Sequence, residues 1–206
     1  MVSGLSSVAN FYVLDKPVSA NFVISCTGAF VDQNGSSRGI SSPDDLAHLV
    51  HLRKQADALV IGGNTARKES YSPTSRFVTY VFSRSSKAAN GLLHKQFDND
   101  ADLQRSFDEL TSAHEHILVE AGPSLLSKLL LAGLIDVLFV SIVHKSHECK
   151  CEMGSTTNIQ AIRSLVRVVL EVPLEALLQV QTFGSTVVTR FDCGEPQRLN
   201  SKRQIA

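Results

Sequence analysis

The chain has 206 residues, 43% of them hydrophobic, which suits one compact domain. Its 20 Lys and Arg residues balance its 20 Asp and Glu residues, so the net charge is zero and no global field attracts nucleic acid or anionic membranes. Four cysteines are too few for a disulfide scaffold, and the absence of Trp disfavours base-stacking platforms. We therefore expect a cytoplasmic α/β protein that binds neither nucleic acid nor membranes.

The domain organisation follows from the same observations. Residues 1–10 lack the basic start and apolar core of a signal peptide, and no apolar stretch approaches the ~20 residues that a membrane span needs. No linker divides the chain. We expect one domain over residues 1–206, with a flexible polar tail from about residue 194.

The first elements are a strand, a loop and a helix. Residues 22–24 form an aromatic and β-branched run that indicates a buried strand, and residues 27–39 form a loop rich in glycine and serine. A helix is expected after Ser42, the candidate N-cap, with Pro43 in its first turn. Its three- and four-residue spacing predicts an apolar face made of Leu46, Leu49 and Val50, with Arg53 near the C-terminal end.

Strands and helices continue to alternate as far as residue 143. Apolar runs predict strands over residues 58–61, 77–82, 117–119 and 135–143. One helix is indicated by Leu103, Phe107 and Leu110, and another begins at Gly122-Pro123 and ends at Gly133. This alternation predicts a mainly parallel sheet flanked by helices. Residues 165–172 and 180–191 look like two further strands with no long helix between them, which predicts an antiparallel pair at the sheet edge.

Two junctions share a buried strand, small residues and a helix start. They cover residues 59–65 and 118–124. Ligands of open parallel sheets bind at the carboxyl ends of the strands, where glycines let the backbone approach a phosphate. The alternative is that these glycines only make tight turns. Because the Gly-x-Gly-x-x-Gly pattern is missing, a dinucleotide site here would belong to an architecture other than the Rossmann fold.

Charged and polar residues at these junctions are candidates for chemistry. Glu120 directly follows an apolar run, which makes it a candidate substrate-binding or proton-handling catalytic group, or else an acid that complements a helix dipole. Thr65 and Glu69 share one face if their turn is helical, although the cluster that they form with Arg67 also suits a solvated turn.

A histidine- and cysteine-containing stretch does not predict a metal site. Its possible ligands are His144, His147, Cys149 and Cys151. In zinc sites the ligand residues are usually separated by more residues, around a turn. The Lys and Glu residues between these possible ligands are typical of a solvated loop. We expect no metal.

Four segments together resemble a known family. They are Ser25–Gly28, Ser37–Asp45 with Leu52-Arg53, Ala56–Pro73, and Val119–Leu125 with Ala132–Asp136. In order and spacing, from about Asn21 to Val143, they resemble the reductase domain of riboflavin biosynthesis. Members of that family are fused to a deaminase or stand alone as pyrimidine reductases, and they have a dihydrofolate-reductase-like fold.

The resemblance implies an NADPH-dependent oxidoreductase that converts the ribosyl group of a phosphorylated aminopyrimidine to a ribityl chain, and it implies a homodimer. The implied substrate-binding residues are Asn21, Ser37, Arg53 and Glu120, with Ser37 and Arg53 at the phosphate end. The implied cofactor-binding residues are Gly63, Thr65, Glu69, Ser83, Arg84, Gly122, Pro123, Ser124 and Leu125.

Three residues depart from the family pattern. Thr27 stands where the family has Asp, Asn21 where many fused members have Lys, and Ala121 where the family has the first glycine of its turn. Two alternatives therefore stay open. One is an NADPH-dependent reductase of another small substrate on the same fold, and the other is a catalytically silent nucleotide-binding protein.

Overall fold

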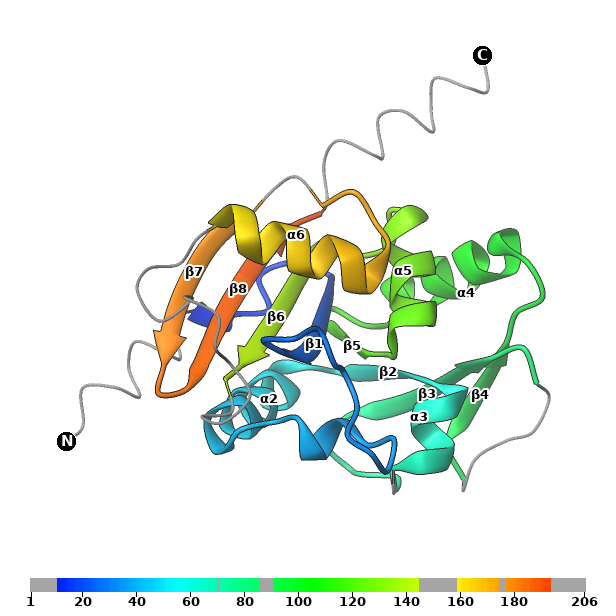
Figure 1. Ribbon diagram of the computed structural model, residues 1–206. Coiled ribbons are helices and arrows are strands. Elements are labelled where there is room, and N and C mark those ends of the chain that lie inside the picture. The colour runs from blue at the N-terminus through cyan, green and yellow to red at the C-terminus, as the bar shows by residue number, and fades with distance from the viewer. Residues whose placement is uncertain (1–10, 70, 86–90, 145–158, 175–176, 194–206) are drawn as a thin grey trace, which may run out of the picture.

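The computed structural model describes residues 11–69, 71–85, 91–144, 159–174 and 177–193 (Figure 1). An eight-stranded sheet runs through this part of the chain, in the order β4-β3-β2-β5-β1-β6-β8-β7. The strands are β1 (Val18–Ser25), β2 (Ala58–Gly62), β3 (Val78–Ser83), β4 (Leu93–Gln96), β5 (Ile117–Glu120), β6 (Val137–Val143), β7 (Leu177–Phe183) and β8 (Thr186–Asp192).

The sheet is parallel from β4 to β6 and antiparallel at its C-terminal end. Strand β5 lies between β2 and β1 and pairs in parallel with both, so β2 and β5 end together beside β1, which continues to Ser25. Strand β8 runs antiparallel to both β6 and β7. The predicted mainly parallel sheet with antiparallel strands at the C-terminal end is confirmed.

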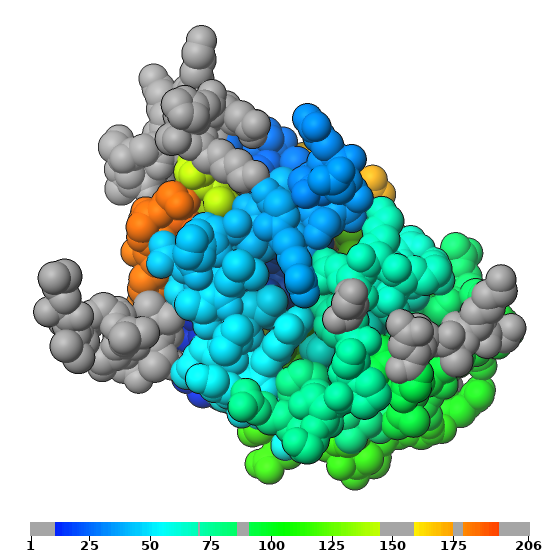
Figure 2. All heavy atoms as spheres, turned by 90° about the horizontal axis from the view of Figure 1, so that it is seen from below, coloured from blue at the N-terminus to red at the C-terminus, as the bar shows by residue number. Residues whose placement is uncertain are grey.

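Helices cover both faces of the sheet (Figure 1). They are η1 (Ser37–Gly39), α2 (Pro43–Gln55), α3 (Gly63–Lys68), α4 (Asp100–Ala113), α5 (Pro123–Leu131) and α6 (Ile159–Leu170). Helices α4, α5 and α6 share one apolar core with the sheet, to which Leu103, Leu126 and Val166 belong. Helices α2 and α3 pack on the opposite face through Leu52 and Ala66. Figure 2 looks onto that face and shows light-blue residues of the α2 region between orange residues of the β7 region and turquoise residues around α3.

Helix α2 begins as expected but buries a different face. Ser42 is its N-cap, and the Ser42 side chain accepts a hydrogen bond from the Asp45 N–H. Leu46 and Val50 are 42% and 48% exposed, whereas Asp45, His48 and Leu52 are buried. The predicted apolar face is therefore wrong. Two contacts explain the orientation of the helix, since the Ser42 hydroxyl hydrogen-bonds Thr186 of β8 over 2.7 Å and His48 stacks on Tyr12 with ring centroids 4.5 Å apart.

The strand expected over residues 165–172 is also wrong, because residues 159–170 form helix α6. The β-branched residues of this run suggested a strand. However, the buried residues Ile162, Val166 and Leu170 follow one another at four-residue spacing, and Val168 is 75% exposed. Packing of one helical stripe against the sheet outweighs the weak local preference of valine for strands.

Both antiparallel strands overlap the second of the two predicted runs and extend slightly beyond it at each end. Residues 180–191 were expected as one strand, but β7 and β8 are separate strands joined at Gly184, whose φ is 54°. A positive φ favours glycine, so the turn forms there. Strand β4 is short and was not predicted. No helix in the described parts of the chain is long and apolar enough to cross a membrane.

Candidate functional site

The site begins where β2 and β5 end, beside the middle of β1. Ile61 of β2 is paired with Glu120 of β5, and Ala20 of β1 is paired with Val119. Ala20 and Val119 point into the core under α4–α6. Because side chains alternate along a strand, Asn21 and Glu120 point to the opposite face, which α2 covers, at neighbouring positions on adjacent strands.

Glu120 is held by two side chains from other segments. The Arg53 Nε donates to Glu120 Oε1 over 2.6 Å, and an Arg53 terminal nitrogen donates to Oε2. The Tyr71 hydroxyl also donates to Oε2, over 3.1 Å, and accepts a hydrogen bond from Arg53 over 3.2 Å. The Glu120 side chain is only 8% exposed, so this bidentate pairing supplies hydrogen bonds that water would otherwise give.

Burial and charge act together on this cluster. Burial by itself lowers the pKa of Arg53, but the hydrogen bonds and charge of Glu120 outweigh it and raise that pKa above its usual range. Burial, and then the charge of Glu120, raises the pKa of Tyr71. Arg53 therefore stays a cation and Tyr71 stays a neutral donor at physiological pH. The arrangement presents Glu120 as a fixed acceptor.

Asn21 adds an unused polar atom beside this cluster. Its Oδ1 is buried and has no hydrogen-bond partner among the described residues. Buried polar atoms nearly always have a partner in folded proteins. An atom of this kind next to a carboxylate is available to a ligand.

The two other polar residues expected near the substrate and cofactor bind each other. The Ser37 hydroxyl donates to Glu69 Oε1 over 2.8 Å, and Lys68 reaches the Gly35 carbonyl. These contacts join the loop after β1 to the end of α3. Thr65 and Glu69 are linked by the helical hydrogen bond from the Glu69 N–H to the Thr65 carbonyl, as the helical alternative predicted.

The two glycine junctions lie side by side at the sheet edge. Gly62 caps α3 and Gly122 caps α5, and neither helix has a side-chain hydrogen bond at its N-cap. A Cβ placed on Gly62 would lie 3.7 Å from Leu125 Cδ2, so the junctions are in contact. The first N–H groups of a helix have no intrahelical partner and carry partial positive charge, which favours an anion.

The glycines differ in what surrounds them. A Cβ on Gly63 would lie 2.9 Å from both Cβ and Oγ of Ser83, which explains why glycine is needed there and places these two predicted cofactor residues together. A Cβ on Gly122 would meet nothing within 4 Å, and φ at Gly122 is an ordinary −65°. Packing among the described residues therefore gives no reason for glycine at position 122.

The remaining predicted residues surround these junctions. Pro123, Ser124 and Leu125 form the first turn of α5, with Ser124 exposed. Arg84 is exposed just beyond the end of β3. The structure thus groups Arg53 of α2 with Asn21 and Glu120 of the sheet, and most cofactor candidates around the starts of α3 and α5. Ser37 and Glu69 instead pair with each other at the end of α3.

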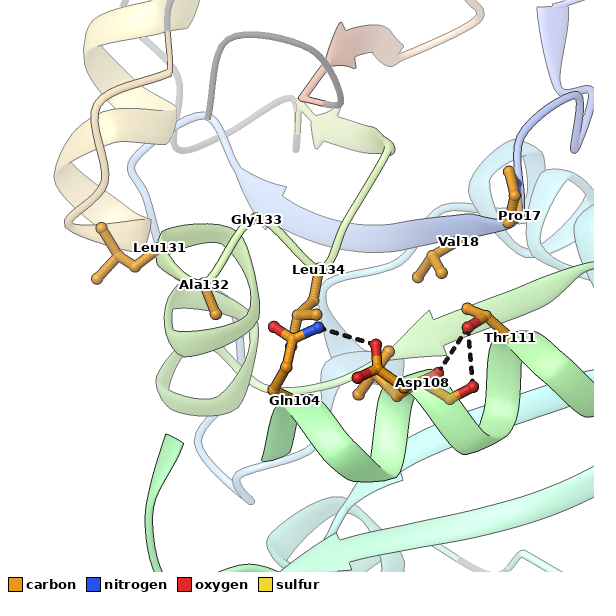
Figure 3. Close-up of a pocket in the computed structure, with 10 residues that line it drawn as sticks. Pro17, Val18, Gln104, Asp108, Thr111, Leu131, Ala132, Gly133 and Leu134 are labelled. Carbon is orange, nitrogen blue, oxygen red and sulfur yellow. Dashed lines mark hydrogen bonds between the residues drawn. The ribbon is translucent and has the colours of Figure 1, made fainter. Parts of the chain in front are cut away.

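A cavity lies elsewhere in the molecule and is not this site. It has a volume of about 460 Å³ and is walled by α4, the end of α5 and the start of β1, at the amino ends of the strands (Figure 3). Its polar side chains serve the helix itself, since Gln104 donates to Asp108 and Thr111 donates to the Phe107 and Asp108 carbonyls. It offers a ligand little beyond these occupied groups.

The structure also bears on the metal prediction. Among the residues that it describes, no group of three or more His, Cys, Asp or Glu side chains could hold a metal ion. His144 lies just after β6, and its backbone N–H donates to Ser185. His147, Cys149 and Cys151 lie outside the described residues.

Tyr71 is the member of the site that sequence reasoning missed. It sits in the segment after α3 that carries the family resemblance, but no spacing rule connects it with Glu120, which is 49 residues away. The available signal was an aromatic residue with a polar tip in an otherwise exposed, polar stretch.

The glycine contrast yields a stability prediction. Gly63→Ala should destabilise the protein by about 1–3 kcal/mol, because its new Cβ meets Ser83. Gly122→Ala should change the stability by less than about 1 kcal/mol, because the backbone suits alanine and the space is open, while glycine is the better N-cap. Urea unfolding of both variants tests this, and equal losses would contradict it.

Comparison with known proteins agrees with the fold. The structure resembles the deaminase and 5-amino-6-(5-phosphoribosylamino)uracil reductase of Thermotoga maritima, at 15% identity and a TM-score of 0.59 over 86% of this chain. This chain spans only 57% of that protein. It also resembles the riboflavin biosynthesis reductase Rib7 of Saccharomyces cerevisiae, at 13% identity and a TM-score of 0.54 over 91% of this chain and 98% of that one.

A dihydrofolate reductase from Enterococcus faecalis, in complex with NADP(H), matches at 13% identity and a TM-score of 0.56, over 85% of this chain and 95% of that one. No curated protein matches in sequence. A family model described as the RibD C-terminal domain matches residues 16–146, more than half of the chain. The protein therefore belongs to the RibD C-terminal domain family and has a dihydrofolate-reductase-like α/β fold.

Proposed function

We propose that this protein is an NADPH-dependent reductase of riboflavin biosynthesis that reduces the ribosyl group of 5-amino-6-(5-phosphoribosylamino)uracil to a ribityl chain. The observation that carries the proposal is the fixed Glu120 carboxylate, held by Arg53 and Tyr71 beside two glycine-capped helix starts. The Glu120 carboxylate offers a hydrogen-bond acceptor for a polar ring, and the neighbouring helix starts suit the phosphates of a dinucleotide.

The residues present fit the cofactor. The open space at Gly122 leaves room for a pyrophosphate against the start of α5, and the first N–H groups of that helix would bind it. Thr65 and Glu69 of the α3 region, with Pro123, Ser124 and Leu125, would complete this side, and Ser83 and Arg84 would lie near the adenosine 2′-phosphate. When bound, NADPH supplies the reducing hydride, and the protein supplies orientation and shelter from water.

The substrate would lie on the α2 side of the sheet edge. Glu120 would accept a hydrogen bond from an N–H group of the aminopyrimidine, and Asn21 would use its unpartnered Oδ1 in the same way. The Arg53 side chain is 29% exposed, so its remaining terminal nitrogen can reach a phosphate, and Ser37 would contact the same end. Glu120 would thus bind and orient the substrate.

Other parts of the proposal have separate support. The names of the Thermotoga and yeast relatives describe riboflavin-pathway reductases, and the Enterococcus relative was solved with NADP(H). Homodimer formation follows from the family resemblance, and a single reductase domain over residues 1–206 follows from the composition and from a sequence without a dividing linker. A cytoplasmic location follows from the composition, and the segment from residue 194 lies outside the described residues.

The deciding experiment is NADPH oxidation by the purified protein with the aminouracil ribose phosphate present. We expect NADPH absorbance to fall only when this substrate is added, and mass spectrometry to show a ribityl product. NADPH binding without turnover would contradict the proposal. A panel of other carbonyl and imine substrates would then separate a reductase of another substrate from a silent nucleotide-binding protein. The silent alternative is considered because Thr27, an exposed residue, stands where the family has Asp.

Cofactor binding at α5 predicts a selective loss in Gly122→Val. The larger side chain would fill the approach to the helix start and weaken NADPH binding by about tenfold or more, while the fold tolerates it. Fluorescence titration with NADPH measures the change, and Gly122→Ala is the matched smaller variant. Unchanged NADPH affinity in a folded Gly122→Val protein would rule out this junction, and equal affinity for NADH and NADPH would rule out the 2′-phosphate role of Ser83 and Arg84.

A phosphate contact by Arg53 predicts a loss that depends on the substrate. Arg53→Ala should lower kcat/KM for the phosphorylated substrate by roughly 10- to 100-fold, and Arg53→Lys should recover part of it. Since either change also disturbs Glu120, the control is the same aminouracil riboside without its phosphate. The penalty should be smaller with that analogue, and an equal penalty with both substrates would contradict a phosphate contact.

A further inference from the structure

Tyr71 enters the site from the segment that follows α3 and contacts two residues there. Its hydroxyl donates to Glu120 Oε2 over 3.1 Å and accepts from Arg53 over 3.2 Å. The guanidinium carbon of Arg53 also lies 5.5 Å from the centroid of the Tyr71 ring. Tyr71 therefore closes a ring of hydrogen bonds with the charged pair.

These contacts use the two oxygens of Glu120 unequally. Each carboxylate oxygen can accept about two hydrogen bonds. Oε2 accepts one from Arg53 and one from Tyr71, whereas Oε1 accepts one, from Arg53 Nε. Oε1 is therefore the oxygen with acceptor capacity left for a ligand.

We infer that Tyr71 is a positioning residue, which fills Oε2 of Glu120 and so presents Oε1 as the single acceptor for an N–H group of the substrate. The inference rests on the proposed function for the identity of that substrate. It assigns the Tyr71 hydroxyl to substrate recognition through Glu120, without direct contact with the substrate.

The electrostatics agree with this assignment. Burial, and next the charge of Glu120, raises the pKa of Tyr71, so its hydroxyl keeps its proton and donates throughout the neutral range. A phenol held in this way cannot turn to accept from Glu120, because an ionised carboxylate offers no hydrogen. The direction of the Tyr71–Glu120 hydrogen bond is thereby fixed.

Steady-state kinetics of Tyr71→Phe test the inference. The Arg53–Glu120 pair remains in this variant, but Oε2 becomes open to water and the carboxylate can shift. We expect KM for the aminouracil ribose phosphate to rise about tenfold, with kcat within about twofold and NADPH affinity unchanged. A purely structural role would instead lower the active fraction, and therefore kcat, at constant KM.

Tyr80→Phe is the matched control. It removes another partly buried phenol hydroxyl, which lies away from the site. This hydroxyl forms a hydrogen bond of 3.0 Å with His114. We expect its KM to equal that of the wild type. A KM increase of similar size in both variants, or none in Tyr71→Phe, would overturn the inference.

A double-mutant comparison with Glu120→Gln asks whether Tyr71 acts through Glu120. If it does, adding Tyr71→Phe to Glu120→Gln should raise KM much less than it does in the wild type. Fully additive effects would show that Tyr71 acts independently of Glu120, which contradicts the inference.

One measurement does not depend on turnover, so it separates this inference from the proposed function. Urea unfolding of the wild type, Tyr71→Phe, Glu120→Gln and the double variant measures whether the two side chains are coupled. We expect Tyr71→Phe to lower the unfolding midpoint much less when residue 120 is already Gln, because the hydrogen bond to the carboxylate is gone. Additive losses would refute the Tyr71–Glu120 coupling even in a protein that turns over the substrate. Coupled losses in a protein without turnover would refute only the proposed function.

Discussion

The burial of one carboxylate constrains the whole site. Glu120 ends a central strand where its neighbours are apolar, and an isolated charge there would be strongly unfavourable. Arg53, 67 residues earlier, and Tyr71, 49 residues earlier, supply the compensating hydrogen bonds. Helix α2, the segment after α3 and strand β5 therefore have to meet at one place. The same contacts that make the buried charge tolerable also determine how it faces a ligand.

Glycine serves two different purposes at the neighbouring junctions, and the structure separates them. Gly63 lets α3 approach the end of β3, where any side chain would meet Ser83, so its role is explained within the protein. Gly122 has an ordinary backbone conformation and open space before it. An alanine there would lose less conformational entropy on folding than glycine does. Glycine is a favoured N-cap residue, and at position 122 it also leaves the start of α5 open to a molecule that approaches the backbone closely.

The sequence allowed the sheet and the junctions to be predicted, because buried strands with glycine at their ends leave a local pattern. It did not reveal which face of α2 is buried, because the burial of Asp45 and His48 depends on Thr186 and Tyr12, which are distant in the chain. Helix α6 was misread because its valines favour a strand locally, whereas the stripe of Ile162, Val166 and Leu170 fits a core built by other segments. Tyr71 was missed for a related reason, since its partners come together only in the folded chain.

The two faces of the sheet differ in a way that accounts for the position of the site. The longer helices α4, α5 and α6 cover one face with a continuous apolar core, in which Phe22, Ile24 and Val119 of β1 and β5 take part. On the other face, the six-residue α3 and the end of α2 stop at the edge, where Asn21 and Glu120 lie. A ligand at this edge can meet polar side chains from the α2 face and helix N–H groups from the α5 side at the same time. This division between an apolar face and a polar edge agrees with the proposed reductase, in which a transfer requires the cofactor and the substrate to lie in contact.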